Sequence, residues 1–435
     1  MCLVHTKLGY VKGERHTGYD CFKGIPYAKP PIGALRFLHA HPIDQWQGVL
    51  DATQWSDIPI QPHNSLERFF AVTDHQYTQN EDCLYLNIWR PNRKVTHPLP
   101  VIIYIYGGSF LNGHSAQDLY QPHEMVKQED VIVVTMNYRI GALGFLDWST
   151  VNSDWDKNNG LSDQICAIQW VHQYIEAFGG HPNHISLMGQ SAGAMSIEAL
   201  LRISSVRPLI KNAILLSGIL KMDRLEDGNQ KAHEFSALKT KHLGARDFET
   251  LSSSEMLFLM EKHQEHYGKS KGLELLYQPI ETEHIDSTYH NVRIPILLSI
   301  TKSEGDIYIA NEHKRLPPAQ FQTVIQRAGL KVPQESEIQT AQQQRDFITT
   351  YYFKKPFQNL YETLSQYTTV WTYEFTWAHP THPDFATPYH ILDVIFWMGR
   401  LDILTAHGAY VSDHDKQLSR HMMRKLCHFV QTGKF

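Results

Sequence analysis

Neither sign of charge dominates this sequence, and it lacks long blocks of like charge. Its 435 residues carry 40 Lys and Arg against 45 Asp and Glu, which gives a formal net charge of −5. A nucleic-acid-binding face needs a basic cluster, and a charged tail needs a run of one sign. We therefore expect no nucleic-acid partner, and a substrate that is small and not polyanionic.

Long apolar runs and cysteines are also scarce. The longest strand-like apolar run, residues 101–106, is far shorter than the roughly 18 residues that span a bilayer, so we expect no membrane helix. The first residues lack the charged and apolar regions of a signal peptide, so we expect no cleaved export signal. Five cysteines at irregular spacing suit reduced thiols in a cytoplasmic protein: Cys2, Cys21, Cys83, Cys166 and Cys427.

Histidine is abundant, at 26 residues, but lacks metal-binding spacing. The nearest pattern, His263-Gln264-Glu265-His266, does not place two histidines four residues apart. We expect no metal site and no cofactor.

The apolar segments that are present predict an α/β protein. Short runs typical of strands covered on both faces recur at residues 101–106, 131–135, 185–188, 213–216, 296–300 and 370–375. An amphipathic helix is expected at about residues 161–178, between the second and third strands. This order predicts a mostly parallel central sheet flanked by helices.

Two polar, helix-rich stretches interrupt this pattern, at about residues 223–289 and 311–359. They contain few strand signals, so we expect helical excursions over the active site that select the substrate. Candidate catalytic residues fall on both sides of them, so one domain is expected over residues 1–435. A last helix is expected at about residues 413–431.

A serine motif lies between an apolar run and a helix-forming stretch. It reads Gly189-Gln190-Ser191-Ala192-Gly193, a G-x-S-x-G pattern. At a sharp strand-to-helix turn the glycines let neighbouring backbone approach, and the serine hydroxyl projects outward as a nucleophile. The N–H of the next residue then faces a developing oxyanion. We therefore predict Ser191 as the nucleophile and Ala192 as an oxyanion-hole donor.

Serine acyl transfer needs further oxyanion donors, an acid and a base. In α/β-hydrolases a second donor comes from a glycine-rich loop after an earlier strand, and the acid and the histidine follow the serine in that order. Gly107 and Gly108 directly follow residues 101–106, so we predict them as the other oxyanion-hole donors.

The serine motif is accompanied by four further segments: residues 22–33 (FKGIPYAKPPIG), 81–89 (EDCLYLNIW), 137–139 (NYR) and 178–180 (FGG). Together they resemble the type-B carboxylesterase and cholinesterase family, most closely its bacterial para-nitrobenzyl esterase branch. The resemblance runs along almost the whole chain. It implies the α/β-hydrolase fold and an ester-hydrolysing active site.

The same resemblance implies the acid and the base. The family places its acid in a D/E-E-G segment after a strand, and Ser303-Glu304-Gly305 follows residues 296–300 here. Glu304 is therefore the expected acid, with Asp306 as the alternative. The family histidine precedes an acidic residue and an aromatic segment that ends in glycine. His390 matches that position and is the expected general base.

Other positions are expected to be structural. The resemblance implies that Arg36 pairs with Glu81, and Arg139 with Asp163, as buried partners. In the family, a cysteine at the position of Cys83 often forms a disulfide, but residues 56–61 contain no cysteine, so a free thiol is expected. Residues 69–80 also lack the tryptophan on which cholinesterases stack a quaternary ammonium, so choline ester specificity is not expected.

The chain departs from the family at Gln190, where glutamate is usual. A neutral amide removes a charge that would favour the imidazolium form of His390, so activity is expected to persist to lower pH than in relatives. The chain also ends several dozen residues before typical members, and we expect the shorter end to reduce packing on the main domain.

The favoured function is a serine carboxylesterase acting on small, fairly apolar esters, with Phe110, Phe396 and Trp397 walling the substrate pocket. Thioesters, lactones, carbamates and amides are alternative substrates, because their hydrolysis uses the same acyl-enzyme mechanism. A non-catalytic binding homologue is the less favoured alternative, since such proteins lack a catalytic residue. We expect no membrane partner and a monomer, with a weak dimer as the alternative.

Overall fold

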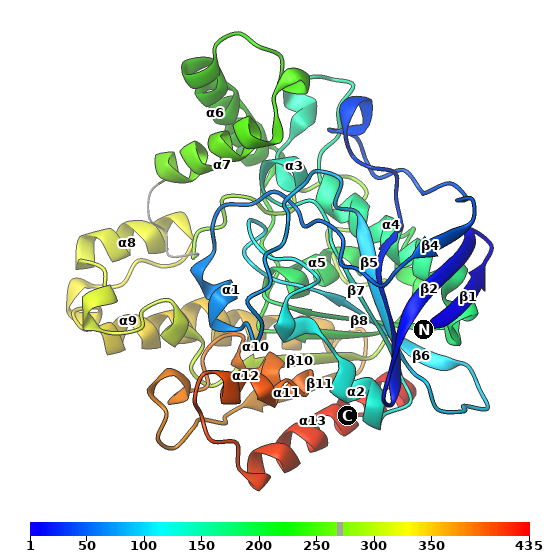
Figure 1. The fold of residues 1–435 in the computed structure, drawn as a ribbon. Helices are drawn as coiled ribbons and strands as arrows, with labels where there is room; N and C mark the ends of the chain where they lie inside the picture. The colour runs from blue at the N-terminus through cyan, green and yellow to red at the C-terminus, as the bar shows by residue number, and fades with distance from the viewer. Residues whose placement is uncertain (268–272) are drawn as a thin grey trace.

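A long β-sheet runs through the centre of the computed structural model, which describes residues 1–267 and 273–435 (Figure 1). The strands are β1 (Cys2–Thr6), β2 (Gly9–His16), β3 (Tyr19–Pro26), β4 (Val49–Asp51), β5 (Tyr85–Pro91), β6 (Leu99–Ile105), β7 (Ile132–Met136), β8 (Gly180–Gln190), β9 (Ile210–Leu216), β10 (Ile296–Thr301) and β11 (Val370–Phe375). In the described residues these form one 11-stranded sheet in the order β1-β2-β3-β5-β7-β6-β8-β9-β10-β11, with β4 paired to β2.

The two halves of the sheet differ in strand direction. From β1 to β7 the neighbours along this path are antiparallel, and from β7 to β11 they are parallel. Every residue of β6, β7 and β10 is buried, as expected for strands covered by helices on both faces. All six strands predicted from apolar runs are present, so the mostly parallel α/β sheet is confirmed.

Helices cover both faces of the sheet. They include α2 (His123–Gln128), α3 (Gly141–Phe145), α4 (Asn159–Tyr174), α5 (Ala192–Leu200), α11 (Leu392–Trp397), α12 (Leu401–Ala406) and α13 (Asp413–Thr432). α4 and α5 pack against β8, whereas α13 packs against β6 and α11 (Figure 1). The predicted helix at 161–178 is α4 with a following 3-10 turn, Ile175–Phe178, and the predicted helix at 413–431 is α13.

The two polar stretches form helical excursions. The first carries α6 (Leu225–Leu243) and α7 (Ser253–Tyr267), and its residues 268–272 lie outside the described residues. The second carries α8 (Pro318–Arg327), α9 (Ala341–Phe347), a π-helical turn (Ile348–Lys354) and α10 (Lys355–Leu364). Phe321, Ile325 and Ile348 belong to a small apolar core of the second excursion, separate from the main core. The excursions extend away from the sheet in Figure 1.

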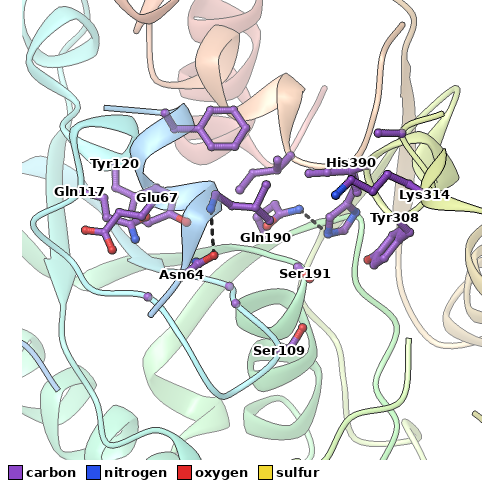
Figure 2. Close-up of a pocket in the computed structure, with 18 residues that line it drawn as sticks. Asn64, Glu67, Ser109, Gln117, Tyr120, Gln190, Ser191, Tyr308, Lys314 and His390 are labelled. Atoms are coloured by element: carbon purple, nitrogen blue, oxygen red, sulfur yellow. Dashed lines mark hydrogen bonds between the residues drawn. The ribbon is translucent and has the colours of Figure 1, made fainter. Parts of the chain in front are cut away.

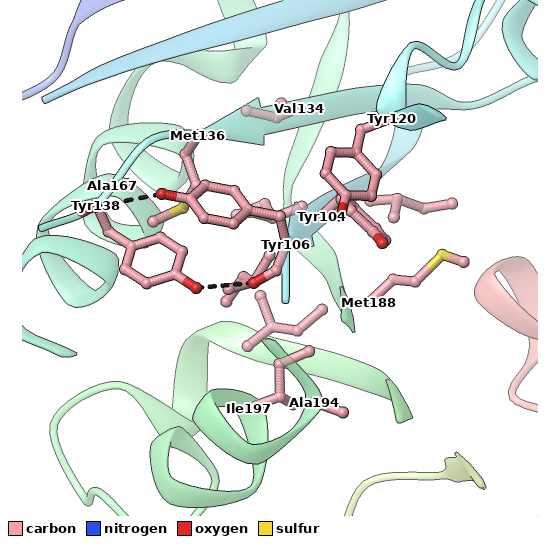
Figure 3. Packing of buried hydrophobic residues seen from close by; sticks show 14 of the residues in the cluster. Tyr104, Tyr106, Tyr120, Val134, Met136, Tyr138, Ala167, Met188, Ala194 and Ile197 are labelled. Atoms are coloured by element: carbon pink, nitrogen blue, oxygen red, sulfur yellow. Dashed lines mark hydrogen bonds between the residues drawn. The ribbon is translucent and has the colours of Figure 1, made fainter. Parts of the chain in front are cut away.

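Two tyrosines in the main core fix the chain directly after β6. The rings of Tyr106 and Tyr138 stack with centroids 4.5 Å apart, and both are fully buried (Figure 3). The hydroxyl of Tyr138 donates to the carbonyl of Tyr106 (2.7 Å), and the hydroxyl of Tyr106 donates to the carbonyl of Tyr138 (3.3 Å). Because each buried hydroxyl is satisfied by backbone, the start of the loop at Gly107 is held in one place.

The two predicted ion pairs are buried in the structure. Arg36 lies 2.6 Å from Glu81 and also donates to the carbonyls of Phe248 and Leu251, which ties the first excursion to the N-terminal part of the chain. Arg139 lies 2.7 Å from Asp163, on α4. Each guanidinium has several acceptors, as a buried charge requires.

All five cysteines are buried and unpaired, so the free thiol expected at Cys83 is confirmed. In the described parts of the chain, no helix combines the length and the apolar character needed to cross a membrane.

Candidate active site

Ser191 stands at a sharp turn between β8 and α5. Its φ of 54° lies in the left-handed region, which a non-glycine residue rarely adopts. A Cβ on Gly193 would fall 2.0 Å from the carbonyl oxygen of Ile105, and a Cβ on Gly218 would fall 2.2 Å from that of Ser191. Only glycine therefore permits the close packing of this turn against its neighbours. The structure forms the nucleophile elbow predicted from the motif.

Backbone strain is concentrated around this turn. Of the six non-glycine residues with positive φ in the described chain, five lie at the site: Ser109 (56°), Phe110 (58°), Ser191 (54°), Ser217 (50°) and Ile391 (78°). Such conformations are unfavourable and persist where the surrounding structure imposes them, most often at functional sites.

Glu304 and His390 meet beneath the elbow although 86 residues separate them. Oε2 of Glu304 lies 2.6 Å from Nδ1 of His390. The other carboxylate oxygen accepts from the hydroxyl of Ser217 and from the N–H of Thr301, both at 2.6 Å. Glu304 is fully buried and His390 is 7% exposed. The carboxylate is therefore fixed in orientation and holds the ring of His390.

These contacts define the tautomer of the histidine. An ionised carboxylate only accepts hydrogen bonds, so Nδ1 of His390 carries the proton and Nε2 is left as an acceptor. The side-chain amide of Gln190 donates to that Nε2 atom at 3.0 Å (Figure 2). The residue before the nucleophile thus contacts the nitrogen that would take the proton of Ser191.

Asp306, the alternative acid, has a different role. Its carboxylate lies 3.8 Å from the guanidinium of Arg345, on α9, and not against His390. Burial raises the pKa of Asp306, and its hydrogen bond from Thr387 acts in the opposite direction. The structure therefore favours Glu304 as the acid.

The predicted oxyanion loop runs beside the elbow. A Cβ on Gly107 would fall 2.9 Å from Cβ of Ser191 and 2.5 Å from the carbonyl oxygen of Gln190. Gly108 has a φ of 122°, and a Cβ there would fall 2.1 Å from the carbonyl oxygen of Asn112. Ala192, the first residue of α5, follows the nucleophile on the other side. The three predicted donor residues therefore surround Ser191.

A cavity of about 500 Å³ opens beside Ser191 and His390 (Figure 2). It is lined by Asn64, Leu66, Glu67, Phe70, Gly107, Gly108, Ser109, Gly113, Gln117, Tyr120, Gln190, Ser191, Ile307, Tyr308, Ala310, Lys314, His390 and Ile391. Leu66 and Phe70 come from the segment around α1 (Ser65–Phe69), and Ile307 to Lys314 follow Glu304 along the chain.

A second, much smaller cavity of about 30 Å³ also borders the nucleophile. It shares Ser109, Ser191 and Tyr308 with the first. Its other lining residues are Ala192, Met195, Ser217, Gly218, Ile219, Lys221, Leu275, Tyr352, Phe353 and Pro356. The second helical excursion therefore contributes directly to the site.

The three aromatic residues predicted to wall the pocket, Phe110, Phe396 and Trp397, do not line it. Phe396 and Trp397 are fully buried on α11 and pack against Phe375 and Tyr373 of β11, with centroids 5.2 and 5.3 Å apart. Phe110 is 1% exposed and packs against Phe145 at 4.6 Å. All three side chains belong to the core, and the aromatic residues that line the cavities are Phe70, Tyr120, Tyr308, Tyr352 and Phe353.

Sequence reasoning did not find the three charged lining residues. Lys314 follows Glu304 along the chain, and the other two are Glu67 and Lys221. Glu67 reaches across to the buried ring of His114, with Oε1 2.6 Å from Nε2. Lys221 lies beside the ring of Tyr352, with its ammonium 4.3 Å from the ring centroid. Both come from segments that show no motif, so only the fold brings them to the serine.

Over residues 1–267 and 273–435, no group of three or more His, Cys, Asp or Glu side chains is placed to hold a metal ion.

A parallel sheet with a serine elbow after β8, and a histidine held by a carboxylate from the loop after β10, defines an enzyme of the α/β-hydrolase class. The chain matches the carboxylesterase family over residues 2–434. It therefore belongs to that family and is a carboxylic ester hydrolase, which confirms the family expected from the motifs.

Individual relatives agree with this assignment. Para-nitrobenzyl esterase of Bacillus subtilis (strain 168) is 32% identical over 444 residues, which cover 99% of this chain and 90% of the relative. Acetylcholinesterase of Danio rerio is 41% identical over 225 residues, which cover 50% of this chain and 35% of the relative.

Solved structures match the fold as a whole. A thermophilic PNB esterase superposes with a TM-score of 0.90 at 30% identity and covers 99% of this chain and 91% of its own. A second PNB esterase structure gives a TM-score of 0.88 at 30% identity, with the same coverage.

Proposed function

We propose that the protein is a serine carboxylesterase that hydrolyses small, fairly apolar esters through an acyl-enzyme intermediate. The hydrogen bond between Glu304 and His390 carries this proposal, because it sets Nε2 as the proton acceptor at the cavity that Ser191 also lines. Ser191 attacks the ester carbonyl as His390 takes its proton. Glu304 stabilises the imidazolium that forms.

The negative charge that develops on the carbonyl oxygen needs donors already in place. We assign this role to the N–H groups of Gly107, Gly108 and Ala192, which surround Ser191. His390 then gives its proton to the leaving alcohol. A water molecule, activated by the same histidine, releases the acid and restores the serine. The cycle consumes one ester and one water and forms one acid and one alcohol.

The large cavity supports an apolar alcohol group. Leu66, Phe70, Ile307 and Ile391 supply apolar surface, and apolar atoms make up most of the surface that lines this cavity. An apolar group is stabilised there by removal of its surface from water.

The test is labelling with a fluorophosphonate together with hydrolysis of para-nitrophenyl acetate. Wild type should be labelled and active, whereas Ser191→Ala should lose the label and activity by at least about 10³-fold. Ser109→Ala is the matched control, because Ser109 lines the same cavity but, unlike Ser191, does not stand at the turn between β8 and α5. Labelling at any residue other than Ser191 would overturn the proposal.

We also propose that the protein acts as a monomer in the cytoplasm. Five buried, unpaired cysteines support a reducing compartment. Gel filtration across a hundredfold range of concentration tests the monomer, and a mass that rises with concentration would contradict it.

A further inference from the structure

The two cavities beside Ser191 differ greatly in size and in their access to His390. The cavity of about 500 Å³ is lined by His390, whereas the cavity of about 30 Å³ is not. Both are lined by Ser191, so they are the two directions in which the parts of an ester can extend from the attacked carbon.

Proton transfer assigns one part of the ester to each cavity. The leaving oxygen must lie within hydrogen-bond reach of Nε2 of His390, because that atom protonates it. The alcohol part therefore occupies the large cavity. The acyl part points to the opposite side, where Ala192 and Met195 of α5 line the small cavity. A cavity of about 30 Å³ has room for roughly two water-sized groups, so the acyl part is short.

Lys221 lies at the wall of this small cavity. Its ammonium donates to the carbonyl of Ala328 at 2.8 Å and lies 4.3 Å from the ring centroid of Tyr352, which lines the same cavity. Ser109, Ser191 and Ser217 are the other polar side chains there, beside tyrosines 308 and 352. No carboxylate lines this cavity among the described residues, so its wall carries one positive charge without a neighbouring acid.

We propose that Lys221 is a specificity-determining residue that selects esters whose short acyl group carries a hydrogen-bond-accepting oxygen. This inference rests on the proposed function and names the acyl half of its substrate. The lysine holds three N–H donors, and one carbonyl and one aromatic face use only part of that capacity. An ether, hydroxyl or carbonyl oxygen in the acyl group adds an acceptor for this half-buried ammonium.

Because Lys221 is partly buried, a hydrogen-bond acceptor in the substrate stabilises its ammonium more than it would stabilise an exposed one. Removal from water lowers the pKa of Lys221 to about 8, because the charged form loses hydration. At neutral pH the group is still mostly protonated, and each added acceptor replaces solvation that it has lost. A purely aliphatic acyl group of the same size provides no such replacement.

The test compares two para-nitrophenyl esters with acyl groups of equal heavy-atom number. Butyrate ends in a methylene and a methyl group, whereas methoxyacetate has an ether oxygen in the chain. The ratio of kcat/KM for methoxyacetate over butyrate is measured for wild type and for Lys221→Met, which is similar in length and uncharged. Comparing the ratios cancels the intrinsic reactivity of the esters. We expect the ratio to fall by about tenfold in the variant.

Lys355→Met is the matched control. Its ammonium also stacks on a tyrosine ring, 4.0 Å from the centroid of Tyr351, but Lys355 does not line the small cavity. Its ratio should equal that of wild type. If the melting curve shows that Lys221→Met does not fold, the same ratio is measured for Lys221→Gln, which should also lower it.

The outcomes separate the two proposals. An unchanged ratio in Lys221→Met, with para-nitrophenyl acetate still hydrolysed, would overturn the role of Lys221 and leave the esterase proposal intact. A wild-type protein that hydrolyses none of the three esters would overturn the proposed function itself. A ratio that falls equally in Lys355→Met would show a general effect of positive charge near the site, and would also overturn the role of Lys221.

Discussion

The side-chain amide of Gln190 donates a hydrogen bond to Nε2 of His390 at 3.0 Å. In the described structure this bond, and not one from the Ser191 hydroxyl, satisfies the basic nitrogen of the histidine. The amide also keeps this side of the ring neutral, where a carboxylate would favour the imidazolium form. Gln190 therefore influences both the charge and the accessibility of the base.

Replacing Gln190 with glutamate is expected to move the acid limb of the kcat/KM profile to higher pH by about one unit. The carboxylate stabilises imidazolium, the form that cannot accept the proton of Ser191, so activity is lost sooner as pH falls. The measurement is a pH–rate profile with para-nitrophenyl acetate. Gln117→Glu is the control, because Gln117 lines the same cavity but lies apart from His390 in Figure 2. Identical acid limbs in wild type and Gln190→Glu would contradict the prediction.

The contact between Glu304 and His390 predicts the effect of an amide at residue 304. In Glu304→Gln, an amide N–H facing His390 forces Nδ1 to accept, so the proton moves to Nε2 and the base is in the wrong tautomer. We expect kcat to fall by about 10³- to 10⁴-fold with little change in melting temperature. Asp306→Asn, two residues away, should keep its activity within about threefold. Equal losses in the two variants would argue against Glu304 as the acid.

The sequence predicted the parallel half of the fold because burial on both faces leaves a continuous apolar run. Residues 101–106 and 131–135 show such runs, and they are β6 and β7. The antiparallel strands β1 and β2 alternate between buried and exposed residues. Their pattern is weaker, and none of the six predicted strands covers them. Ser191, Glu304 and His390 could be predicted from the sequence, because each lies in a local motif at the end of a strand or in the loop that follows one.

The pocket could not be predicted in the same way. Phe396 and Trp397 follow His390 closely in the sequence, but the turn at Ile391 and the helix α11 direct them into the core against β11. The residues that do line the cavities, such as Leu66 and Lys221, come from segments distant in sequence. Their positions depend on how loops and excursions pack, and no local sequence pattern predicts that packing.

Asp393 should make stability depend on pH. It is fully buried near Glu304, and its Oδ2 accepts from Nε1 of Trp397 at 3.2 Å. Burial, with the charge of Glu304, raises its pKa from 3.8 to about 7. The carboxyl thus ionises at lower pH in the unfolded chain than in the native state, so the free energy of unfolding falls as pH rises from about 4 to about 7.

Asp393→Asn keeps the shape and removes this ionisation. We expect it to raise stability at pH 8 by on the order of a few kcal/mol relative to wild type and to flatten the profile between pH 4 and 7. Urea unfolding across that range measures both effects. Asp402→Asn should do the opposite at pH 8, because its carboxylate pairs with Arg400 at 2.8 Å. A variant at residue 393 that is less stable than wild type at pH 8 would refute this reading.

The size of the small cavity predicts an acyl-length limit that one leucine helps to set. With room for roughly two water-sized groups, wild type should hydrolyse para-nitrophenyl acetate, propionate and butyrate well. It should lose about tenfold or more in kcat/KM at hexanoate, because each methylene that does not fit disfavours the transition state by ~1–3 kcal/mol. Leu275 lines this cavity, so Leu275→Ala should recover about tenfold on hexanoate. Leu66→Ala enlarges only the alcohol side and should leave the acyl-length profile unchanged. A shift of that profile by Leu66→Ala, and none by Leu275→Ala, would reverse the assignment of the two cavities.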